Sequence, residues 1–262
     1  MKTIPSEILP PLGFSCFGPA TGKTIAVTHG WAADSEFTKS IIELFPEHRI
    51  MLIDLPGYGK SAHLADFCND FETIATMINI TVPENTVLMS WSLSTLYAIR
   101  ACAQPASHIK ALITICGAPR FPDEDGNPGF NQRYIKKLNE SFNERTFLRL
   151  VKLFYSIQGN SAGGKTISES FARFKIPPFE VLNSGILHML QADERKELKD
   201  LKIPVLHLFG KNDLLVPALQ TSVLKSAMQS RIHVFEHSAH LPFITEPENF
   251  KAEIESFLTQ LK

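Results

Sequence analysis

The stretch VLMSWSLSTLYA, residues 87–98, decides the fold of this chain. It is a short apolar strand that turns through serines into a helical pattern, an arrangement that presents a nucleophilic serine above a parallel sheet. Such a turn usually has glycine two residues before and after the nucleophile, because the strand and helix backbones approach closely there. Here Ser90 and Ser94 hold those positions, and only Ser92 has a small residue on both sides. Ser92 is the predicted nucleophile, although this fragment alone also fits a helix with a serine-rich N-cap.

The order of other motifs along the chain makes this interpretation specific. Two apolar strands precede the serine turn, at 24–29 and 50–55. After it, one late strand is followed by Asp213 and the next by His240. The order Ser…Asp…His is that of the α/β hydrolases, and it differs from the orders in chymotrypsin and subtilisin. Asp54 and His237 are the rival acid and the rival histidine.

Six segments, spread over nearly the whole chain, carry a resemblance to a known family: HGW (29–31), DLPGYGKS (54–61), WSL (91–93), VLNSG (181–185), DLLVP (213–217) and AHLPFI (239–244). They resemble the BioH-type pimeloyl-[acyl-carrier protein] methyl ester esterases of biotin synthesis. The chain departs from the pattern at the two elbow serines and at Ala239, where many α/β hydrolases have glycine. The resemblance implies a serine carboxylesterase that acts on a carrier-bound pimeloyl methyl ester, with acyl carrier protein as partner and no cofactor.

The rhythm of apolar runs predicts the architecture. Runs rich in Val, Ile and Leu recur at 24–29, 50–55, 86–90, 111–116, 204–209 and 232–236, with helical patterns between most of them. Continuous apolar strands spaced by helices indicate an α/β fold, with a mostly parallel central sheet and helices on both faces. No such apolar run occurs between about 119 and 191. We therefore expect a helical cap at 121–190, inserted after the sixth core strand of an α/β-hydrolase core formed by 1–120 and 191–262.

The predicted cap is aromatic and basic. Most of its aromatic residues are expected to pack against the core, and Phe154 is a candidate for lining an acyl pocket. Residues 129–176 contain nine basic and three acidic side chains, although the whole chain has a net charge of −1. Arg145, Arg149 and Lys152 are spaced i, i+4 and i+7, as on one face of a helix. This pattern fits either a solvated helix face or a dock for an acidic carrier protein.

The motifs assign a role to each candidate residue. Ser92 would attack the ester carbonyl, His240 would accept and return the proton, and Asp213 would orient the imidazole. The backbone N–H groups of Leu93 and Trp31 would form the oxyanion hole. The nine histidines do not fall at metal-ligand spacings with acids or thiols, so no metal site is expected.

Composition bounds the remaining possibilities. With 262 residues, 44% hydrophobic and 20% charged, the chain suits one globular domain with an insertion. The near-neutral charge predicts no attraction to nucleic acid or membrane. The N-terminal sequence lacks a signal-peptide pattern, and no apolar run approaches the ~20 residues that span a bilayer. Four cysteines without C-x-x-C spacing favour a reduced, cytoplasmic compartment. We expect a monomer.

Other functions stay open at this point. GNSAGGKT (159–166) matches the phosphate-loop pattern of nucleotide-binding proteins. The preceding residues continue a helical pattern, whereas a phosphate loop follows a buried strand. We therefore interpret the segment as a turn between cap helices and keep a P-loop protein as a distant alternative. A nearer one is a general short-chain carboxylesterase or a carbon–carbon bond hydrolase of the same fold.

Overall fold

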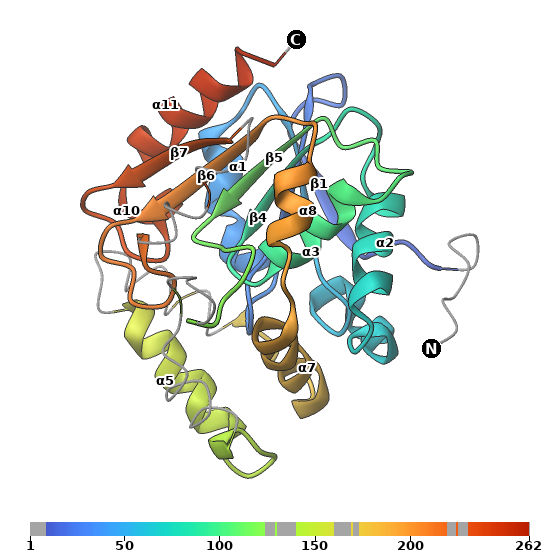
Figure 1. The fold of residues 1–262 in the computed structure, drawn as a ribbon, viewed down its shortest axis with the longest axis vertical. Helices are drawn as coiled ribbons and strands as arrows, with labels where there is room; N and C mark the ends of the chain where they lie inside the picture. Colours follow the sequence, from blue (N-terminus) through green and yellow to red (C-terminus); the bar gives the residue numbers. More distant parts are fainter. Residues whose placement is uncertain are drawn as a thin grey trace.

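The computed structural model describes residues 9–123, 129, 140–159, 169, 173–218, 224 and 230–261. Its centre is a seven-stranded sheet with the strand order β1-β3-β2-β4-β5-β6-β7 (Figure 1). The strands are β1 (Phe14–Phe17), β2 (Thr24–Thr28), β3 (Arg49–Ile53), β4 (Val87–Trp91), β5 (Ala111–Ile115), β6 (Val205–Gly210) and β7 (Ser230–Phe235). All neighbouring pairs are parallel except β1 with β3.

The predicted α/β fold with a mostly parallel sheet is confirmed. All six apolar runs became strands, and every residue of β4, β5 and β6 is buried. Burial on both faces explains why these runs are continuously apolar rather than alternating. The sequence did not predict β1, whose residues alternate between exposed and half-buried at the edge of the sheet.

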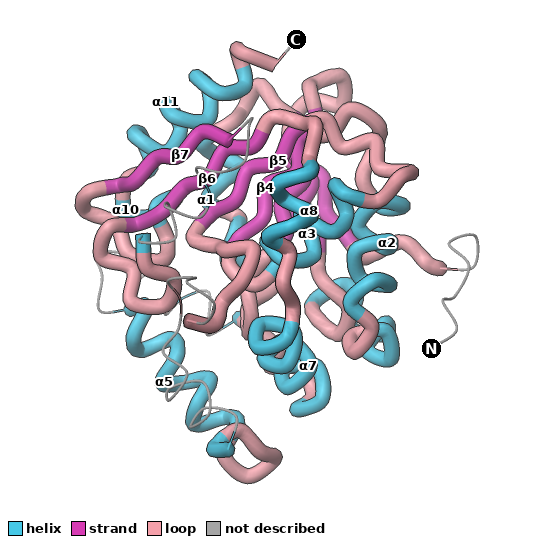
Figure 2. The backbone as a smooth tube through the Cα atoms, viewed as in Figure 1, coloured by secondary structure: helices cyan, strands magenta, loops and turns pink. Residues whose placement is uncertain are grey.

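Helices cover both faces of the sheet (Figures 1 and 2). On one face α2 (Phe71–Thr81), α3 (Ser94–Ala103) and α8 (Arg195–Asp200) pack together. On the other, α1 (Ser40–Leu44), α10 (Pro242–Thr245) and α11 (Pro247–Leu258) form the layer. Two 3-10 segments, η2 (Ser35–Thr38) and η3 (Gly59–Phe67), follow β2 and β3. No helix in the described ranges is long and apolar enough to cross a membrane.

Two further helices come from the segment predicted as a cap. They are α5 (Phe147–Gly159) and α7 (Phe179–Gln191), and both lie beyond the carboxyl ends of the strands (Figure 1). This segment was predicted to follow the sixth core strand, and five of the described strands, β1 to β5, precede it. The boundaries 121 and 190 stay a prediction.

Candidate active site

The turn from β4 to α3 holds Ser92 in a strained conformation. Its φ is +59°, in the left-handed region, which costs a non-glycine residue about 1–2 kcal/mol. Two backbone hydrogen bonds maintain this conformation: Ser92 N–H donates to Ile115 O on β5 (2.8 Å), and Thr95 N–H donates to Ser92 O (3.0 Å). A strained serine between a parallel strand and a helix is the geometry of a nucleophile elbow.

The two serines that flank Ser92, Ser90 and Ser94, differ in their hydrogen bonds. Ser94 Oγ accepts a hydrogen bond from Trp91 N–H (3.1 Å) and lies 3.0 Å from Thr28 Oγ1. Ser90 Oγ makes longer contacts, with Thr95 Oγ1 (3.3 Å) and the Ile113 carbonyl (3.4 Å). Both hydroxyls are fully buried inside the turn, whereas Ser92 keeps a small exposed fraction, 6%. Serines therefore fit at the usual glycine positions because their hydroxyls find hydrogen-bond partners both in the turn and on the neighbouring strands β2 and β5.

Asp213 and His240 form a buried pair. His240 Nδ1 donates to Asp213 Oδ2 at 2.7 Å, and their side chains are 3% and 0% exposed. The other carboxylate oxygen, Oδ1, accepts the backbone N–H groups of Leu215 (2.8 Å) and Val216 (3.0 Å). These bonds fix the carboxylate and, through it, the tautomer and orientation of the imidazole.

The other nitrogen of His240 is available to accept a proton. Nε2 is buried and has no hydrogen-bond partner among the described residues. Because Nδ1 carries the hydrogen, Nε2 is left as an acceptor, and an unpaired buried acceptor is costly. The His240 carbonyl accepts a hydrogen bond from the indole of Trp91 (3.0 Å), the residue before Ser92. The loop with the histidine is thus tied directly to the serine turn.

The rival residues have structural environments. The Asp54 carboxylate accepts the backbone N–H groups of Ser35 (2.8 Å) and Lys60 (2.9 Å), which closes the loop after β3. His237 is exposed on the surface. Neither residue forms a hydrogen-bonded acid–imidazole pair within the described part of the chain, in contrast to Asp213 and His240.

The loop after β2 brings Trp31 close to the serine turn. A Cβ on Gly30 would lie 3.1 Å from Ser92 Cβ, so glycine allows the close approach of the two backbones. His29 Nδ1 donates to the Gly30 carbonyl (2.9 Å), and its Nε2 accepts Leu55 N–H (3.0 Å). Burial lowers the pKa of His29, so this imidazole stays neutral and braces the loop.

Phe154, from α5, contacts Trp31. Its ring meets the Trp31 indole edge-on, with 5.0 Å between centroids. Phe142 also contacts the indole, with 5.8 Å between ring centroids, and Phe142 itself stacks on Phe179 of α7. Two aromatic residues of the predicted cap therefore contact Trp31, the predicted oxyanion residue, in addition to packing against other aromatic rings.

The three basic residues of the cap are exposed, but they do not all share a helix. Arg149 and Lys152 lie on α5, while Arg145 belongs to the turn before it. The expected helical spacing is wrong for Arg145, because the turn at 143–146, with Thr146 N–H bonded to the Asn143 carbonyl, ends just before α5 begins at Phe147. None of the three forms an ion pair with a residue that the structure describes.

The thiol of Cys116 lies beside the Asp213–His240 pair, a position that was not predicted from the sequence. One ligand atom each of Cys116, Asp213 and His240 lie within 4.8 Å of one another, a grouping that could hold a metal ion. A metal ligand must be a thiolate, but burial and the neighbouring Asp213 raise the pKa of Cys116 well above its usual value. Its thiol donates to the Ala239 carbonyl (3.6 Å), so hydrogen bonding explains its place. Because Cys116 follows an apolar strand, its sequence context resembles that of any core cysteine.

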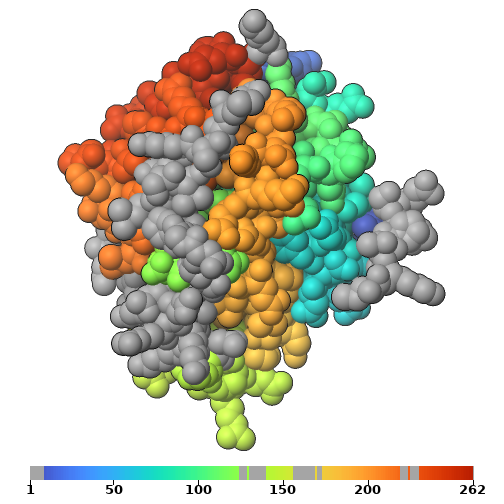
Figure 3. Space-filling view, in the orientation of Figure 1, coloured from blue at the N-terminus to red at the C-terminus, as the bar shows by residue number. Residues whose placement is uncertain are grey.

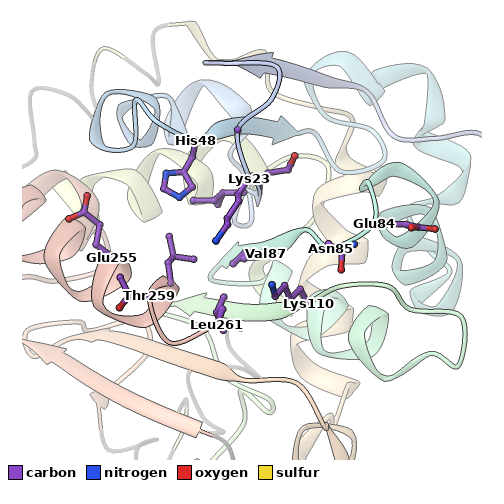
Figure 4. A pocket seen from close by; sticks show the side chains of 13 residues that line it. Lys23, His48, Glu84, Asn85, Val87, Lys110, Glu255, Thr259 and Leu261 are labelled. Atoms are coloured by element: carbon purple, nitrogen blue, oxygen red, sulfur yellow. The ribbon is translucent and has the colours of Figure 1, made fainter.

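A separate pocket lies at the amino ends of the strands, which is the end of the sheet opposite to Ser92 (Figure 4). It has a volume of about 630 Å³ and is lined by the amino ends of β2 and β4 and by the end of α11. Its charged lining contains two lysines and two glutamates, Lys23, Lys110, Glu84 and Glu255. Ser92 follows the carboxyl end of β4, so this pocket is remote from the candidate catalytic residues.

The fold and the serine elbow define an enzyme class, and comparison with known proteins agrees. The profile of the alpha/beta hydrolase fold family matches residues 23–247, and this chain belongs to that family. The predicted family resemblance is also confirmed. The chain is 30% identical to the pimeloyl-[acyl-carrier protein] methyl ester esterase of Pectobacterium carotovorum, over 89% of this chain and 93% of that one. It is likewise 30% identical to the protein of that name from Vibrio vulnificus strain YJ016, over 90% and 94%.

Solved structures show the same fold at lower identity. An esterase from Exiguobacterium antarcticum superposes with a TM-score of 0.83 at 22% identity, covering 94% of this chain and 95% of that one. A bromoperoxidase from Bacillus anthracis gives a TM-score of 0.81 at 19% identity, with the same coverage. The family profile spans the phosphate-loop-like segment, most of which lies outside the described residues.

Proposed function

We propose that this carboxylic ester hydrolase removes the methyl group from a pimeloyl methyl ester carried on acyl carrier protein, using Ser92, His240 and Asp213. The observation that supports the chemistry best is the buried 2.7 Å contact between His240 Nδ1 and Asp213 Oδ2, in a chain whose Ser92 is strained at the elbow. The relatives named pimeloyl-[acyl-carrier protein] methyl ester esterase support the substrate.

The proposed reaction is an acyl transfer in two steps. Ser92 Oγ attacks the ester carbonyl carbon while His240 Nε2 takes the hydroxyl proton. Asp213, fixed by two backbone N–H groups, stabilises the imidazolium that forms. The tetrahedral oxyanion is bound by the N–H groups of Leu93 and Trp31. It collapses to an acyl-enzyme, and His240 gives the proton to the departing methanol. Water then attacks the acyl-enzyme by the same route, releasing a carboxylate.

The cap offers a surface for an acidic carrier. Arg145, Arg149 and Lys152 are exposed, and α5 protrudes at the lower end of the molecule (Figure 3). Leu148 and Leu153 on the same helix are 46% and 53% exposed, which adds apolar contact area beside the charges. Because Phe154 reaches from this helix to Trp31, a carrier docked on α5 would be close to the route by which an acyl chain reaches Ser92.

Charge reversal on this surface tests the carrier. Changing Arg145, Arg149 and Lys152 to Glu should raise KM for the carrier-linked methyl ester by about tenfold, because complementary charge accelerates encounter. Turnover of p-nitrophenyl butyrate, a small neutral ester, should be nearly unchanged. Added salt should depress the wild type on the carrier-linked ester and barely affect the triple variant. Steady-state kinetics on both esters at low and high salt provide the measurement.

A matched control removes the effect of net charge alone. Lys196, Lys199 and Lys202 are exposed on or beside α8 and not on α5, and reversing them changes the charge of the protein equally. This control should keep the wild-type KM for the carrier-linked ester. Equal losses in both triple variants, or equal losses on both esters, would contradict docking on α5. Preference for free over carrier-linked methyl esters would instead favour a general short-chain carboxylesterase.

A further inference from the structure

The loop that carries Trp31 is held by both cap helices. The Trp31 indole Nε1–H donates to the Leu182 carbonyl on α7 at 2.8 Å. The indole also packs edge-on against Phe154 of α5. The indole is 95% buried, so these contacts are made away from water. Each joins residues more than a hundred positions apart, and each connects the core to the cap.

Tyr155 holds the next residue of the same loop. Its hydroxyl donates to the carbonyl of Ala32, and its ring stacks on Phe37 with 5.2 Å between centroids. Ala32 has a φ of +53°, so it is strained in the left-handed region that favours glycine. Such strain persists only where surrounding contacts enforce it. The buried Tyr155 hydroxyl is one of those contacts, and it comes from α5.

Gly185 places α7 against both predicted oxyanion residues. A Cβ at this position would lie 2.7 Å from Trp31 Cδ1 and 3.1 Å from Leu93 Cδ2. The first distance is shorter than real Cβ contacts, so any side chain here would displace Trp31. Glycine is a poor helix former, and its presence in the middle of α7 is explained by this close approach.

We propose that Tyr155 and Gly185 are positioning residues through which α5 and α7 set the two oxyanion-hole donors, Trp31 N–H and Leu93 N–H. This rests on the proposed function, in which these N–H groups stabilise the oxyanion. The cap then has a role in the chemical step as well as in covering the substrate. Oxyanion donors act mainly in the transition state, so misplacing them lowers kcat more than it raises KM.

A single hydroxyl deletion tests the first residue. Tyr155→Phe keeps the ring stack on Phe37 but removes the bond to Ala32. For p-nitrophenyl butyrate we expect kcat to fall about tenfold, less than the loss of a whole oxyanion donor, with KM within about twofold of wild type. Binding of butylboronic acid, whose serine adduct mimics the tetrahedral intermediate, should weaken by a similar factor.

Tyr97→Phe is the matched control. Tyr97 is a buried tyrosine whose hydroxyl lies 2.8 Å from His188 Nδ1, so it also joins the core to α7, but this bond does not involve the Trp31 loop. It should leave kcat and boronate affinity unchanged. Wild-type values for Tyr155→Phe, or equal losses in the two variants, would overturn the proposal.

Gly185→Ala gives an independent measurement. We expect a loss of kcat at least as large as for Tyr155→Phe, although alanine is the better helix former. This variant decides the matter if Tyr155→Phe does not fold, and wild-type kcat in Gly185→Ala would overturn the proposal. Ser92→Ala separates the two ideas: retained hydrolysis in that variant would refute the proposed function, whereas failure of the cap variants alone would refute only the positioning role.

Discussion

At the scale of single residues, three serines within five positions have different environments. Ser90 and Ser94 are enclosed by hydrogen-bond partners, and Ser92 alone has a positive φ. The sequence predicted the choice of Ser92 from the size of its neighbours. It could not predict why serine replaces glycine at the flanking positions, because Thr28 and Ile113 come from other strands.

The Ser94 hydroxyl should matter for stability rather than for catalysis. Ser94→Ala removes a buried hydroxyl that accepts hydrogen bonds from Trp91 N–H and Thr28 Oγ1, and the loss of such a buried partner costs about 1–3 kcal/mol. We expect the free energy of unfolding in urea to fall by that amount, while the folded variant keeps most of its esterase activity. Ser90→Ala, whose contacts are longer, should lose less. An inactive but fully stable Ser94→Ala enzyme would contradict this assignment.

Some residues of the site could be predicted from the sequence, and others could not. Ser92, Asp213 and His240 were predictable because each follows a strand whose carboxyl end reaches the same edge of the sheet. Tyr155 and Gly185 were not, because their contacts with Ala32, Trp31 and Leu93 depend on how the cap lies on the core. Gly185 ends the VLNSG segment that carries the family resemblance, but neither that segment nor the sequence around Tyr155 shows what these residues contact.

At the scale of elements, the buried strands were predictable and the edges were not. β1 is short and half-exposed, so it lacks the apolar run that marks the other strands. Between β2 and β3 the chain forms two short helices, η2 and α1, with Asp34 capping the first by accepting Glu36 N–H. Burial raises the pKa of this carboxyl to about 6. These irregular segments follow the strands that carry the loops of the site.

One element gives stability a pH dependence. His207 on β6 is fully buried, with Nδ1 2.7 Å from Thr114 Oγ1, and burial lowers its pKa to about 3. In the unfolded chain this imidazole takes up a proton below about pH 6.5, whereas the folded one stays neutral, so stability falls as the pH falls. The loss from this residue should approach about 1.4 kcal/mol for each pH unit between 6.5 and 3.

Urea unfolding at pH 7, 6 and 5 measures this effect. His207→Gln should show a shallower decline of unfolding free energy than the wild type, because glutamine does not titrate. His237→Gln, which changes an exposed histidine, should retain the wild-type slope. Parallel slopes for His207→Gln and the wild type would contradict the assigned cause.

At the scale of the whole molecule, the candidate active site and the pocket at the amino ends of β2 and β4 lie at opposite ends of the sheet. The candidate catalytic residues and both cap helices gather beyond the carboxyl ends of the strands, where α/β proteins bind ligands. Positive charge concentrates in the segment 129–176, while the rest of the chain is acidic. The sequence alone shows this charge asymmetry. Only the structure shows that α5 and α7 also contact the loop beside Ser92.

Covalent labelling tests the central claim, that Ser92 is the nucleophile, most directly. The protein is treated with a serine-directed alkyl phosphonate, and the adduct is located by mass spectrometry of its peptides. One adduct should form, on Ser92; it should be absent from Ser92→Ala, which should also lose about 10³-fold or more of hydrolysis, and present in Ser90→Ala. A label on Ser90 or Ser94, or a labelled and active Ser92→Ala enzyme, would contradict the account.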